Sequence, residues 1–355
     1  MPDRDADVAV GIVANPASGR DIRRLVAQAS VFPTTEKADM VQRILAGLAA
    51  TGVDSALLSV DLGGISAGVL RARNRRRPGA DPPWPHVTFL DEDVPTNSAQ
   101  DTRNAVGRML DAGARVVICL GGDGTARVAA SAILDHPAPT GARRDVPLMA
   151  LSTGTNNVFP RLREATVAGV AAGLVATGAV DPATATTRAR ILDVDAGDRR
   201  ERALVDVGVC AAHFVGSRAL WDPTAVSEIY CAFAEPDAVG LSSIAGLICP
   251  SPREKPQGVV LRLGSVDSAP VVVRAPIAPG VVLPVGVLDW CVLRSGEARP
   301  VTATSGVIAV DGEREIELHG DRAASVRLRD DGSLCVDIAA VMSEAAGEGL
   351  LRSHH

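Results

Sequence analysis

The 355-residue chain contains almost no lysine and few aromatic residues. Lys37 and Lys255 are its lysines, and neither lies in the Gly-Lys-Ser/Thr sequence that a Walker A phosphate loop requires. Phosphate binding would therefore rely on arginine side chains, backbone N–H groups or a metal ion. With five Phe, three Trp and one Tyr, the core must consist mainly of Val, Ala and Leu.

The chain also lacks an excess of positive charge and long apolar runs. Its 36 basic and 42 acidic side chains give a net charge of −6, the wrong sign for neutralising nucleic acid phosphates. No apolar run reaches the roughly 18 residues of a membrane span, and residues 1–7 are acidic and polar. Six cysteines are scattered singly without a Cys-x-x-Cys pair. We expect a cytoplasmic protein with reduced thiols that binds neither nucleic acid nor membrane.

The length predicts two domains, and the first reads as a doubly wound α/β domain over residues 1–178. Apolar runs alternate there with segments of helical periodicity, as in sheets with helices on both faces. The strands are predicted at 8–14, 54–60, 86–90, 115–120 and 147–151. The helices are predicted at about 40–48, 96–112, 126–134 and 164–176. Ligands of such domains bind at the carboxyl ends of the strands.

The second domain is predicted to be an antiparallel β-sandwich over residues 188–338, after a linker at 178–187. Short apolar runs follow one another there, separated by Gly, Pro and Asp turns. We predict strands at 189–195, 201–210, 257–263, 269–275, 286–293, 306–310, 315–318, 324–329 and 333–338. A helical insert is expected at 223–248, and the segment 339–355 can pack back on the first domain.

A Gly-rich turn, Gly121–Thr125, separates a buried strand from a helix. Backbone N–H groups at such a helix start form an anion cradle. Asp123 adds a carboxylate that could hold Mg²⁺ or accept a proton from an attacking hydroxyl, which makes it the candidate catalytic residue. A structural turn with a capping Asp is the alternative. The candidate phosphate-binding residues of the turn are Gly121, Gly122, Gly124 and Thr125.

Two more polar loops follow strands of the same sheet. One follows the strand at 147–151 and the other follows the strand at 8–14. Their hydroxyl and amide groups suit ribose, base or phosphate. The candidate nucleotide-binding residues are Thr153, Gly154, Thr155, Asn156 and Asn157 in one loop, and Asn15, Ser18 and Gly19 in the other. Three such loops at one edge of a sheet predict a nucleotide site there.

These loops carry a family resemblance. Asn-Pro-x-Ser-Gly, Gly-Gly-Asp-Gly-Thr and Thr-Gly-Thr-Asn-Asn, in this order, resemble the superfamily of NAD kinases and diacylglycerol kinases. The sequence is most similar to the ATP-NAD kinase branch that includes the acetoin catabolism protein AcoX. The resemblance implies an α/β domain followed by a β-sandwich, and a Mg²⁺-dependent kinase using ATP or polyphosphate. Asp123 is then the residue nearest the chemistry and a candidate Mg²⁺ ligand.

The resemblance also implies a substrate site in the second domain. NAD kinases carry an Asn-Glu pair there, and the best-matching positions here are Val205 and Asp206. Asp311 and Glu313 resemble an Asp-Gly-Glu sequence near the interdomain cleft, although an Asp-Gly hairpin turn explains it equally well. Arg218 is the candidate cationic partner of a substrate phosphate. Loss of the Asn places NAD itself in question as the substrate.

We predict a kinase that phosphorylates a hydroxyl of a nucleotide-like cofactor, first of all the ribose 2′-hydroxyl of NAD or NADH. Another phosphorylated cofactor, such as thiamine diphosphate, is an alternative acceptor. A lipid acceptor ranks low because no basic amphipathic helix is evident. A different alternative is a non-catalytic nucleotide-binding regulator of acetoin-type catabolism. We also expect a homo-oligomer, either a dimer or a tetramer.

Overall fold

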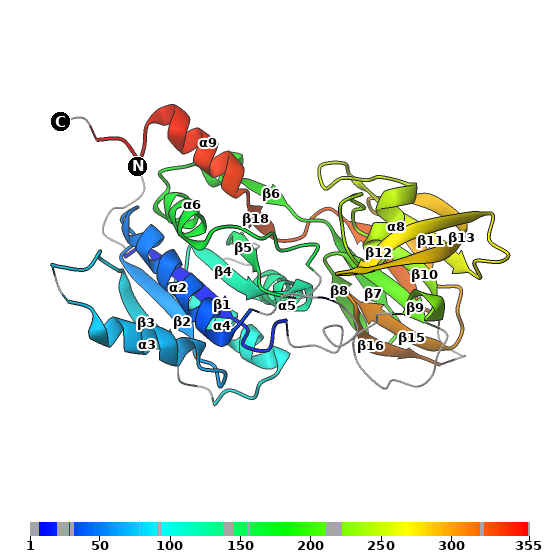
Figure 1. Cartoon of the computed structure of the whole chain (residues 1–355), viewed down its shortest axis with the longest axis horizontal. Coiled ribbons are helices and arrows are strands. Elements are labelled where there is room, and N and C mark those ends of the chain that lie inside the picture. The colour runs from blue at the N-terminus through cyan, green and yellow to red at the C-terminus, as the bar shows by residue number, and fades with distance from the viewer. Residues whose placement is uncertain are drawn as a thin grey trace.

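The computed structural model describes residues 7–19, 28, 32–77, 79–90, 92, 94–137, 145–154, 157–210, 222–319 and 323–353. An α/β unit and a unit of antiparallel sheets lie side by side (Figure 1), which confirms the predicted fold class. Among the helices in these ranges, none is both long and apolar enough to cross a membrane.

The α/β unit is organised by a seven-stranded sheet of order β3-β2-β1-β4-β5-β18-β6. The five strands β1 to β5 are parallel to one another and lie at the predicted positions. Strands β1 and β4 are buried along their whole length. Apolar residues on both faces suit a strand covered from both sides. The five bounds are β1 Ala9–Ala14, β2 Ser55–Ser59, β3 His86–Leu90, β4 Val116–Gly121 and β5 Leu148–Ser152.

Helices cover both faces of this sheet. One face carries α2 (Thr34–Ala49), α3 (Ile65–Arg75) and α6 (Ala165–Thr177), and the other carries α4 (Ala99–Asp111) and α5 (Asp123–Asp135). Two glycines bring α2 and α6 together. A Cβ on Gly47 would lie 2.5 Å from the Thr166 carbonyl oxygen, and one on Gly169 would lie 2.4 Å from that of Ile44. Only glycine allows so close an approach of two backbones.

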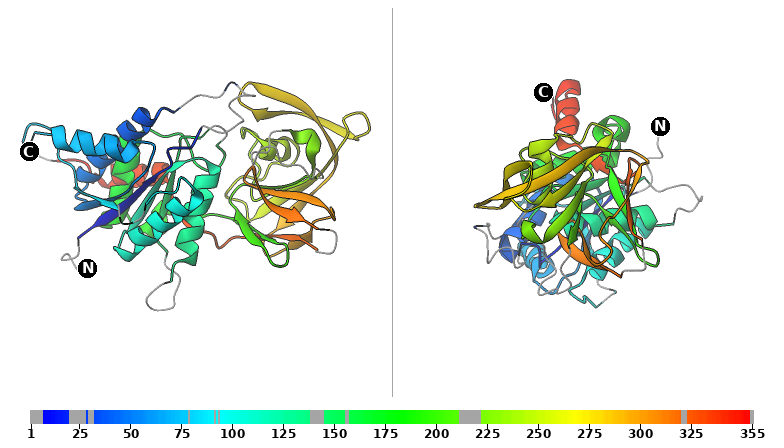
Figure 2. Two further views of the ribbon diagram at one scale, coloured as in Figure 1. Left: turned by 90° about the horizontal axis from the view of Figure 1, so that it is seen from below. Right: turned by 90° about the vertical axis from the view of Figure 1, so that its right-hand side faces the viewer.

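The second unit consists of two antiparallel sheets, and it faces the viewer in the right-hand view of Figure 2. The larger has the order β12-β13-β11-β10-β9-β15-β16, with bounds Val271–Ala278, Val281–Arg294, Gln257–Gly264, Val226–Cys231, Asp206–Cys210, Gly306–Val310 and Glu313–Leu318. The smaller has the order β14-β17-β7-β8, with bounds Ala298–Pro300, Ser325–Arg329, Ile191–Asp195 and Arg200–Ala203. One apolar core continues from α4 and α5 into this unit.

The predicted helical insert at 223–248 is wrong for most of its length. A 3₁₀ turn (Pro223–Ala225) leads into β10, which lies between β9 and β11, and only α8 (Leu241–Ile248) is helical. Strand β10 has β-branched and aromatic residues and is almost wholly buried. Glu228 interrupts its apolar character, but its carboxylate is satisfied by Thr302, Ala303 and the Tyr230 hydroxyl.

Two further predictions need correction. The predicted linker at 178–187 contains α7 (Pro182–Ala185) and the start of β6 (Thr186–Arg188). The strand predicted at 333–338 is β18 (Leu334–Val336), which joins the α/β sheet between β5 and β6 rather than a sandwich sheet. The following α9 (Ile338–Glu348) packs against α6 and α7, as its place above the α/β unit in Figure 1 shows.

Candidate functional site

The Gly-rich turn is tighter than the sequence predicts. Strand β4 runs through Gly121, Gly122 is the N-cap, and Asp123 already opens α5. A Cβ on Gly121 would lie 2.4 Å from the Thr125 Cβ, so a larger residue would displace the first turn of the helix. The N–H groups of this turn and the helix dipole therefore meet at the carboxyl edge of the sheet, where an anion is stabilised.

Asp123 is held by backbone N–H groups of a distant loop. The Phe159 N–H donates to Oδ1 at 2.8 Å, and the Val158 N–H donates to both carboxylate oxygens at 3.1 and 3.2 Å. These bonds, which come from two successive N–H groups, fix the orientation of the carboxylate. Asp123 is partly exposed at the side of the helix start.

The three predicted loops do meet at one place. Asn15 Nδ2 donates to Thr125 Oγ1 at 2.9 Å, which joins the first loop to the Gly-rich turn. The hydroxyls of Ser18 and Thr153 lie 3.1 Å apart, and the Thr153 N–H donates to the Gly121 carbonyl at 2.9 Å. Gly19, at φ +76°, could not carry a Cβ without contacting the Thr153 carbonyl oxygen at 2.9 Å.

Asn157 connects the third loop to the helix start. Its Nδ2 donates to Ser152 Oγ and to the Gly154 carbonyl, at 2.5 and 2.7 Å. Its Oδ1 is buried without a hydrogen-bond partner within the described ranges. A Cβ on Gly122 would lie 3.2 Å from this oxygen, and one on Gly154 only 2.4 Å from it. The described residues thus leave a buried amide oxygen unpaired beside the Gly-rich turn, where it is a candidate ligand for a metal ion.

Lys37 organises the first loop, a role that the sequence analysis missed. Its side chain is wholly buried, and Nζ donates to the carbonyl oxygens of Asn15, Pro16 and Ser18 at 3.0, 3.1 and 2.8 Å. The α2 periodicity could have revealed it, because Lys37 precedes Val41 and Ile44 on the buried face. The ammonium group therefore shapes the loop and does not project toward a phosphate.

A cavity of about 380 Å³ opens at the ends of β1 and β2 beside the start of α5. Four predicted site residues line it: Asn15, Gly124, Thr125 and Glu313. The strand order reverses between β1 and β4, which is the switch point where open α/β sheets bind ligands. The first and second units both contribute to it, since Glu313 comes from β16.

Three of the predicted carboxylates, Asp123, Asp206 and Asp311, border a second space of only about 30 Å³ between the units. Val205 also lines it, with a side chain that is almost wholly buried and offers no amide. The structure thus brings the predicted catalytic residue close to two of the four predicted substrate residues, Asp206 and Asp311.

Asp311 has a structural task that its sequence context does not reveal. The chain changes sheets between β8 and β9, and the buried N–H groups of Leu204, Val205 and Asp206 donate to its carboxylate at 2.8–3.2 Å. Burial raises the pKa of this carboxyl to about 6, although Arg127 and the three N–H groups oppose the rise. Asp311 and Gly312 both have positive φ, as a two-residue hairpin turn requires.

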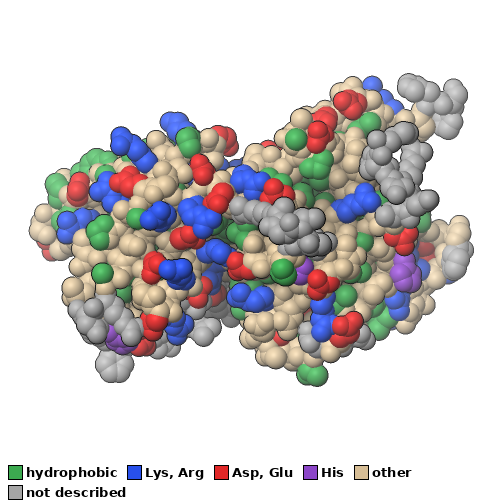
Figure 3. All heavy atoms as spheres, turned by 180° about the vertical axis from the view of Figure 1, so that it is seen from behind, with side chains coloured by type: hydrophobic (Ala, Val, Ile, Leu, Met, Phe, Trp, Pro, Cys, Tyr) green, Lys and Arg blue, Asp and Glu red, His purple; other side chains and the backbone are tan. Residues whose placement is uncertain are grey.

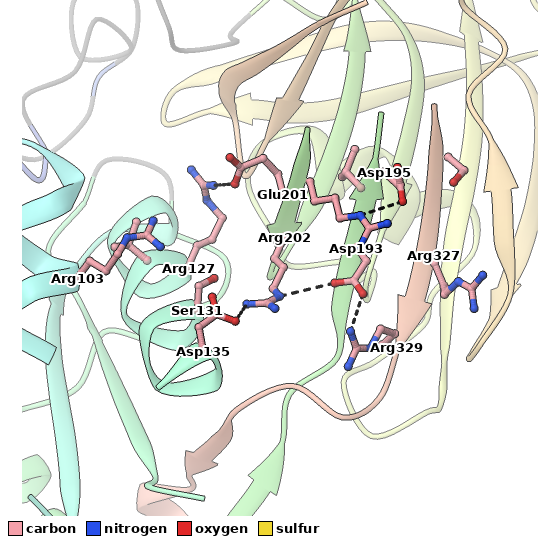
Figure 4. A pocket seen from close by; sticks show the side chains of 14 residues that line it. Arg103, Arg127, Ser131, Asp135, Asp193, Asp195, Glu201, Arg202, Arg327 and Arg329 are labelled. Atoms are coloured by element: carbon pink, nitrogen blue, oxygen red, sulfur yellow. Dashed lines mark hydrogen bonds and ion pairs between the residues drawn. The ribbon is translucent and has the colours of Figure 1, made fainter. Parts of the chain in front are cut away.

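Arg127 is a second residue that the sequence analysis missed. It is almost completely buried, and its guanidinium lies 3.4 Å from Glu201, 3.7 Å from Asp311 and 3.8 Å from Glu313. It lines the cavity of about 380 Å³ at the ends of β1 and β2, and also a polar cavity of about 660 Å³ between α5 and the smaller sheet. Figure 4 shows it reaching from α5 toward Glu201.

Arg253 is a third unanticipated residue, and it holds the far side of the loop that positions Asp123. Its guanidinium donates to the Val158 and Phe159 carbonyl oxygens and to Glu235, and it lies 4.2 Å from the Phe233 ring centroid. Burial lowers the pKa of Arg253. Nothing in the local sequence marks this arginine.

Three of the predicted site residues, Thr155, Asn156 and Arg218, lie outside the described residues. The described ranges contain no cluster of three or more His, Cys, Asp or Glu side chains suited to a metal ion. The Asp123 carboxylate and the Asn157 amide oxygen nevertheless fit Mg²⁺. This ion commonly takes one or two protein oxygens and completes its coordination shell with water and substrate phosphates.

Comparison with known proteins adds to this geometry. Residues 10–180 match the ATP-NAD kinase N-terminal domain, and residues 190–331 match the Acetoin catabolism protein X C-terminal domain. The chain is 41% identical over 350 residues to Acetoin catabolism protein X of Cupriavidus necator, covering 97% of this chain and 94% of that protein.

Two solved structures are similar at low identity. A protein of Bacillus anthracis str. Sterne, provisionally identified as a diacylglycerol kinase, is 11% identical with a TM-score of 0.44, over 93% of this chain and 97% of that chain. An NAD kinase of Archaeoglobus fulgidus in complex with ATP is 12% identical with a TM-score of 0.37, over 85% of this chain and 100% of that chain.

Proposed function

Because this chain belongs to the Acetoin catabolism protein X branch of the ATP-NAD kinase family, we propose that it phosphorylates a hydroxyl of a nucleotide-like cofactor. The best candidate acceptor is the ribose 2′-hydroxyl of NAD or NADH, with ATP as donor and polyphosphate as a possible replacement. The observation that carries the proposal is the meeting of three polar loops with Asp123 at the start of α5. A phosphotransferase needs this combination of anion cradle and fixed carboxylate.

The proposed reaction is a direct transfer. The acceptor oxygen forms a bond to the γ-phosphorus of ATP, the bond from that phosphorus to the bridging oxygen breaks, and ADP leaves. The hydroxyl proton passes to the Asp123 carboxylate, whose orientation is fixed by Val158 and Phe159. The N–H groups at the start of α5 stabilise the charge on the transferring phosphoryl group.

The remaining residues bind and position the substrates. We assign the cavity of about 380 Å³ to the phosphoryl donor. Asn15 and Thr125 are hydrogen-bonded in its wall, and Glu313 lines it from the second unit. Asp123 and Asn157 would hold a Mg²⁺ ion, which when bound would neutralise charge on the donor phosphates. Thr155, Asn156 and Arg218 stay proposals from sequence.

The identity of the acceptor depends on Val205 and Asp206. Val205 replaces an Asn of NAD kinases and buries its side chain, while Asp206 keeps a carboxylate beside Asp123. A carboxylate can accept hydrogen bonds from ribose hydroxyls, which supports a dinucleotide acceptor. The missing amide favours a second candidate, another phosphorylated cofactor such as thiamine diphosphate. We also propose a cytoplasmic homo-oligomer, a dimer or a tetramer.

A cofactor panel tests the function. The purified protein is incubated with Mg-ATP together with one acceptor, which is NAD, NADH or thiamine diphosphate in parallel reactions. Mass spectrometry follows the gain of one phosphate by the acceptor. We expect phosphorylation of NAD or NADH and stoichiometric release of ADP. Thermal stabilisation by nucleotides with no ATP consumed on any acceptor would instead support a non-catalytic regulator.

A further inference from the structure

A groove of about 520 Å³ lies along the outer edge of β5, where β18 pairs with β5 only through Cys335 and Leu148. It is on the opposite side of the Val158–Phe159 backbone from Asp123. The N–H groups of these two residues face Asp123, whereas their carbonyl oxygens face Arg253, which lines the groove. We call this space the edge groove, and it is separate from the cavities at the Gly-rich turn.

The floor of the edge groove is apolar and partly aromatic. Phe159 and Phe233 contribute rings that are almost wholly buried beneath the Arg253 guanidinium, which lies 5.5 and 4.2 Å from their centroids, and Val336 and Ile338 add half-buried aliphatic surface. Pockets of this size with aromatic walls bind small organic molecules, and flat rings pack best against such walls.

The rim is cationic. Five arginines and two acidic residues line the groove, namely Arg161, Arg163, Arg188, Arg190 and Arg253 with Glu254 and Asp337. Asp337 is already engaged as the N-cap of α9. Arg188 is paired with Asp145, but Arg163 and Arg190 form no ion pair within the described part of the chain. Arg190 is buried, donates to the Gln257 and Pro252 carbonyls, and lies within the electrostatic influence of Glu254. With five arginines against two acidic residues in the lining, an anion would still find an excess of positive charge here.

The polar cavity of Figure 4 differs in its carboxylates and in its lack of aromatic residues. Each of its carboxylates contacts an arginine: Glu201 with Arg127, Asp135 and Asp193 with Arg202, and Asp195 with Arg200. All four of its carboxylates are therefore paired, whereas Arg103 and Arg327 of its lining form no ion pair in the described ranges, and no aromatic residue lines it. Figure 3 likewise shows basic and acidic side chains interspersed on one face of the molecule.

We propose that the edge groove is a binding site for a small anion with a flat apolar ring, of the size and chemistry of a purine nucleoside monophosphate. The anionic group is attracted by the arginine rim, and the ring packs on the guanidinium plane of Arg253, which lies over the Phe159 and Phe233 rings. Guanidinium groups are the preferred protein partners of phosphate.

Occupancy of this site bears on Asp123 through a short chain of contacts. Arg161 of the rim lies 3.7 Å from Glu235, which also pairs with Arg253 at 3.2 Å. An anion that binds Arg161 would weaken its contact with Glu235, so that Glu235 would pair with Arg253 alone. Arg253 donates to the Val158 and Phe159 carbonyls, and its position therefore affects the N–H groups of the same loop that bind Asp123. This coupling rests on the proposed function, whereas binding itself does not.

The test is calorimetric titration of the full chain with AMP, with inorganic phosphate and adenosine as separate arms. The variant is Arg161→Gln with Arg163→Gln, and the matched control is Arg71→Gln with Arg75→Gln, two exposed arginines of α3. We expect AMP to bind the unaltered protein and the control alike, and the rim variant about tenfold more weakly or worse.

Equal AMP affinity of the rim variant and the unaltered protein, or no AMP binding at all, would overturn the site. Inorganic phosphate binding as tightly as AMP would overturn the role of the apolar floor. In the panel assay, AMP should alter the transfer rate of the unaltered protein and of the control, and leave that of the rim variant unchanged. Binding without an effect on rate would contradict the coupling and leave the site standing, and absence of any transfer would bear on the proposed function alone.

Discussion

At the scale of single residues, Lys37 gives the sharpest stability prediction. Lys37→Met would leave three buried or half-buried carbonyl oxygens of the first loop without their charged donor. We expect the free energy of unfolding to fall by about 2–4 kcal/mol, since a hydrogen bond to a charged group contributes roughly 1.5–3 kcal/mol. Urea denaturation measures the loss.

The sequence supplies its own control for this change. Lys255 is exposed, and Lys255→Met should alter the free energy of unfolding by less than about 0.5 kcal/mol. ATP-dependent thermal stabilisation should also be weaker in Lys37→Met and unchanged in Lys255→Met. Equal stability of the two variants would contradict the structural role of Lys37.

Asp311 predicts a pH dependence of stability. Its pKa is raised from 3.8 to about 6 in the folded chain, so the folded state holds the proton more tightly than the unfolded state. The stabilisation is fully present below pH 3.8 and is lost as pH rises through about 6, by at most about 3 kcal/mol. In Asp311→Asn, this loss between pH 4 and pH 7 should disappear. Urea denaturation across that range measures it.

A control for the pH series is Asp267→Asn, because Asp267 is exposed in the second unit. This variant should keep the pH profile of the unaltered protein. If Asp311→Asn also kept that profile, the buried carboxyl would not be the group that titrates.

The sequence predicted some roles of single residues and missed others for identifiable reasons. The contacts of Asn15, Ser18 and Thr153 follow from the ends of parallel strands meeting at one edge, which periodicity reveals. The structural role of Asp311 depends on a change of sheet at Leu204–Asp206, which leaves no local pattern. Arg253 reaches residues almost a hundred positions away, so only the folded chain reveals it.

At the scale of elements, the packing of loops around the start of α5 depends on glycine. In Gly154→Ala, the Cβ would lie 2.4 Å from Asn157 Oδ1 and 2.9 Å from the Gly122 Cα. We expect a loss of about 1–3 kcal/mol and at least a tenfold loss of transfer, since neither backbone can move without disturbing the other. Thermal denaturation and the transfer assay measure the two effects.

Gly107→Ala is the matched control, because nothing lies within 4 Å of a Cβ at this position in α4. Alanine favours the helix, so this variant should be more stable by about 0.5–1 kcal/mol and equally active. A Gly154→Ala protein that behaved like Gly107→Ala would show that the loops are not packed as described.

Periodicity located strands β1 to β5 of the α/β unit well, but it missed α3 and placed β18 in the second unit. Buried parallel strands are continuous apolar runs that stand apart from amphipathic helices, and β1 to β5 were placed within a few residues. The 223–248 segment misled because β10 is short and buried and is followed by the true helix α8. An apolar run of this length does not distinguish strand from helix.

At the scale of the whole molecule, Arg253 ties the two units together at the catalytic loop. It contacts Glu235 and Phe233 on one side and the Val158 and Phe159 carbonyls on the other. In Arg253→Met the loop that holds Asp123 loosens, and we expect kcat to fall roughly tenfold to a hundredfold with little change in the KM for ATP. Steady-state kinetics measures the split.

Arg253→Lys should restore part of the turnover, because an ammonium group can still donate to one of the carbonyls. Arg199→Met, at an exposed position of the second unit, should leave kcat unchanged. A rise in KM with kcat preserved would indicate that Arg253 contributes to donor binding instead of to the position of Asp123.

The central claim is that Asp123, at the start of α5, is the catalytic residue of a phosphotransferase. Its most direct test compares Asp123→Asn with Asp267→Asn, an exposed control, in the Mg-ATP transfer assay followed by mass spectrometry. Thermal denaturation shows whether both variants are folded. We predict that folded Asp123→Asn loses at least a hundredfold of transfer while the control transfers normally. A folded Asp123→Asn protein that kept most of its transfer activity would contradict the claim.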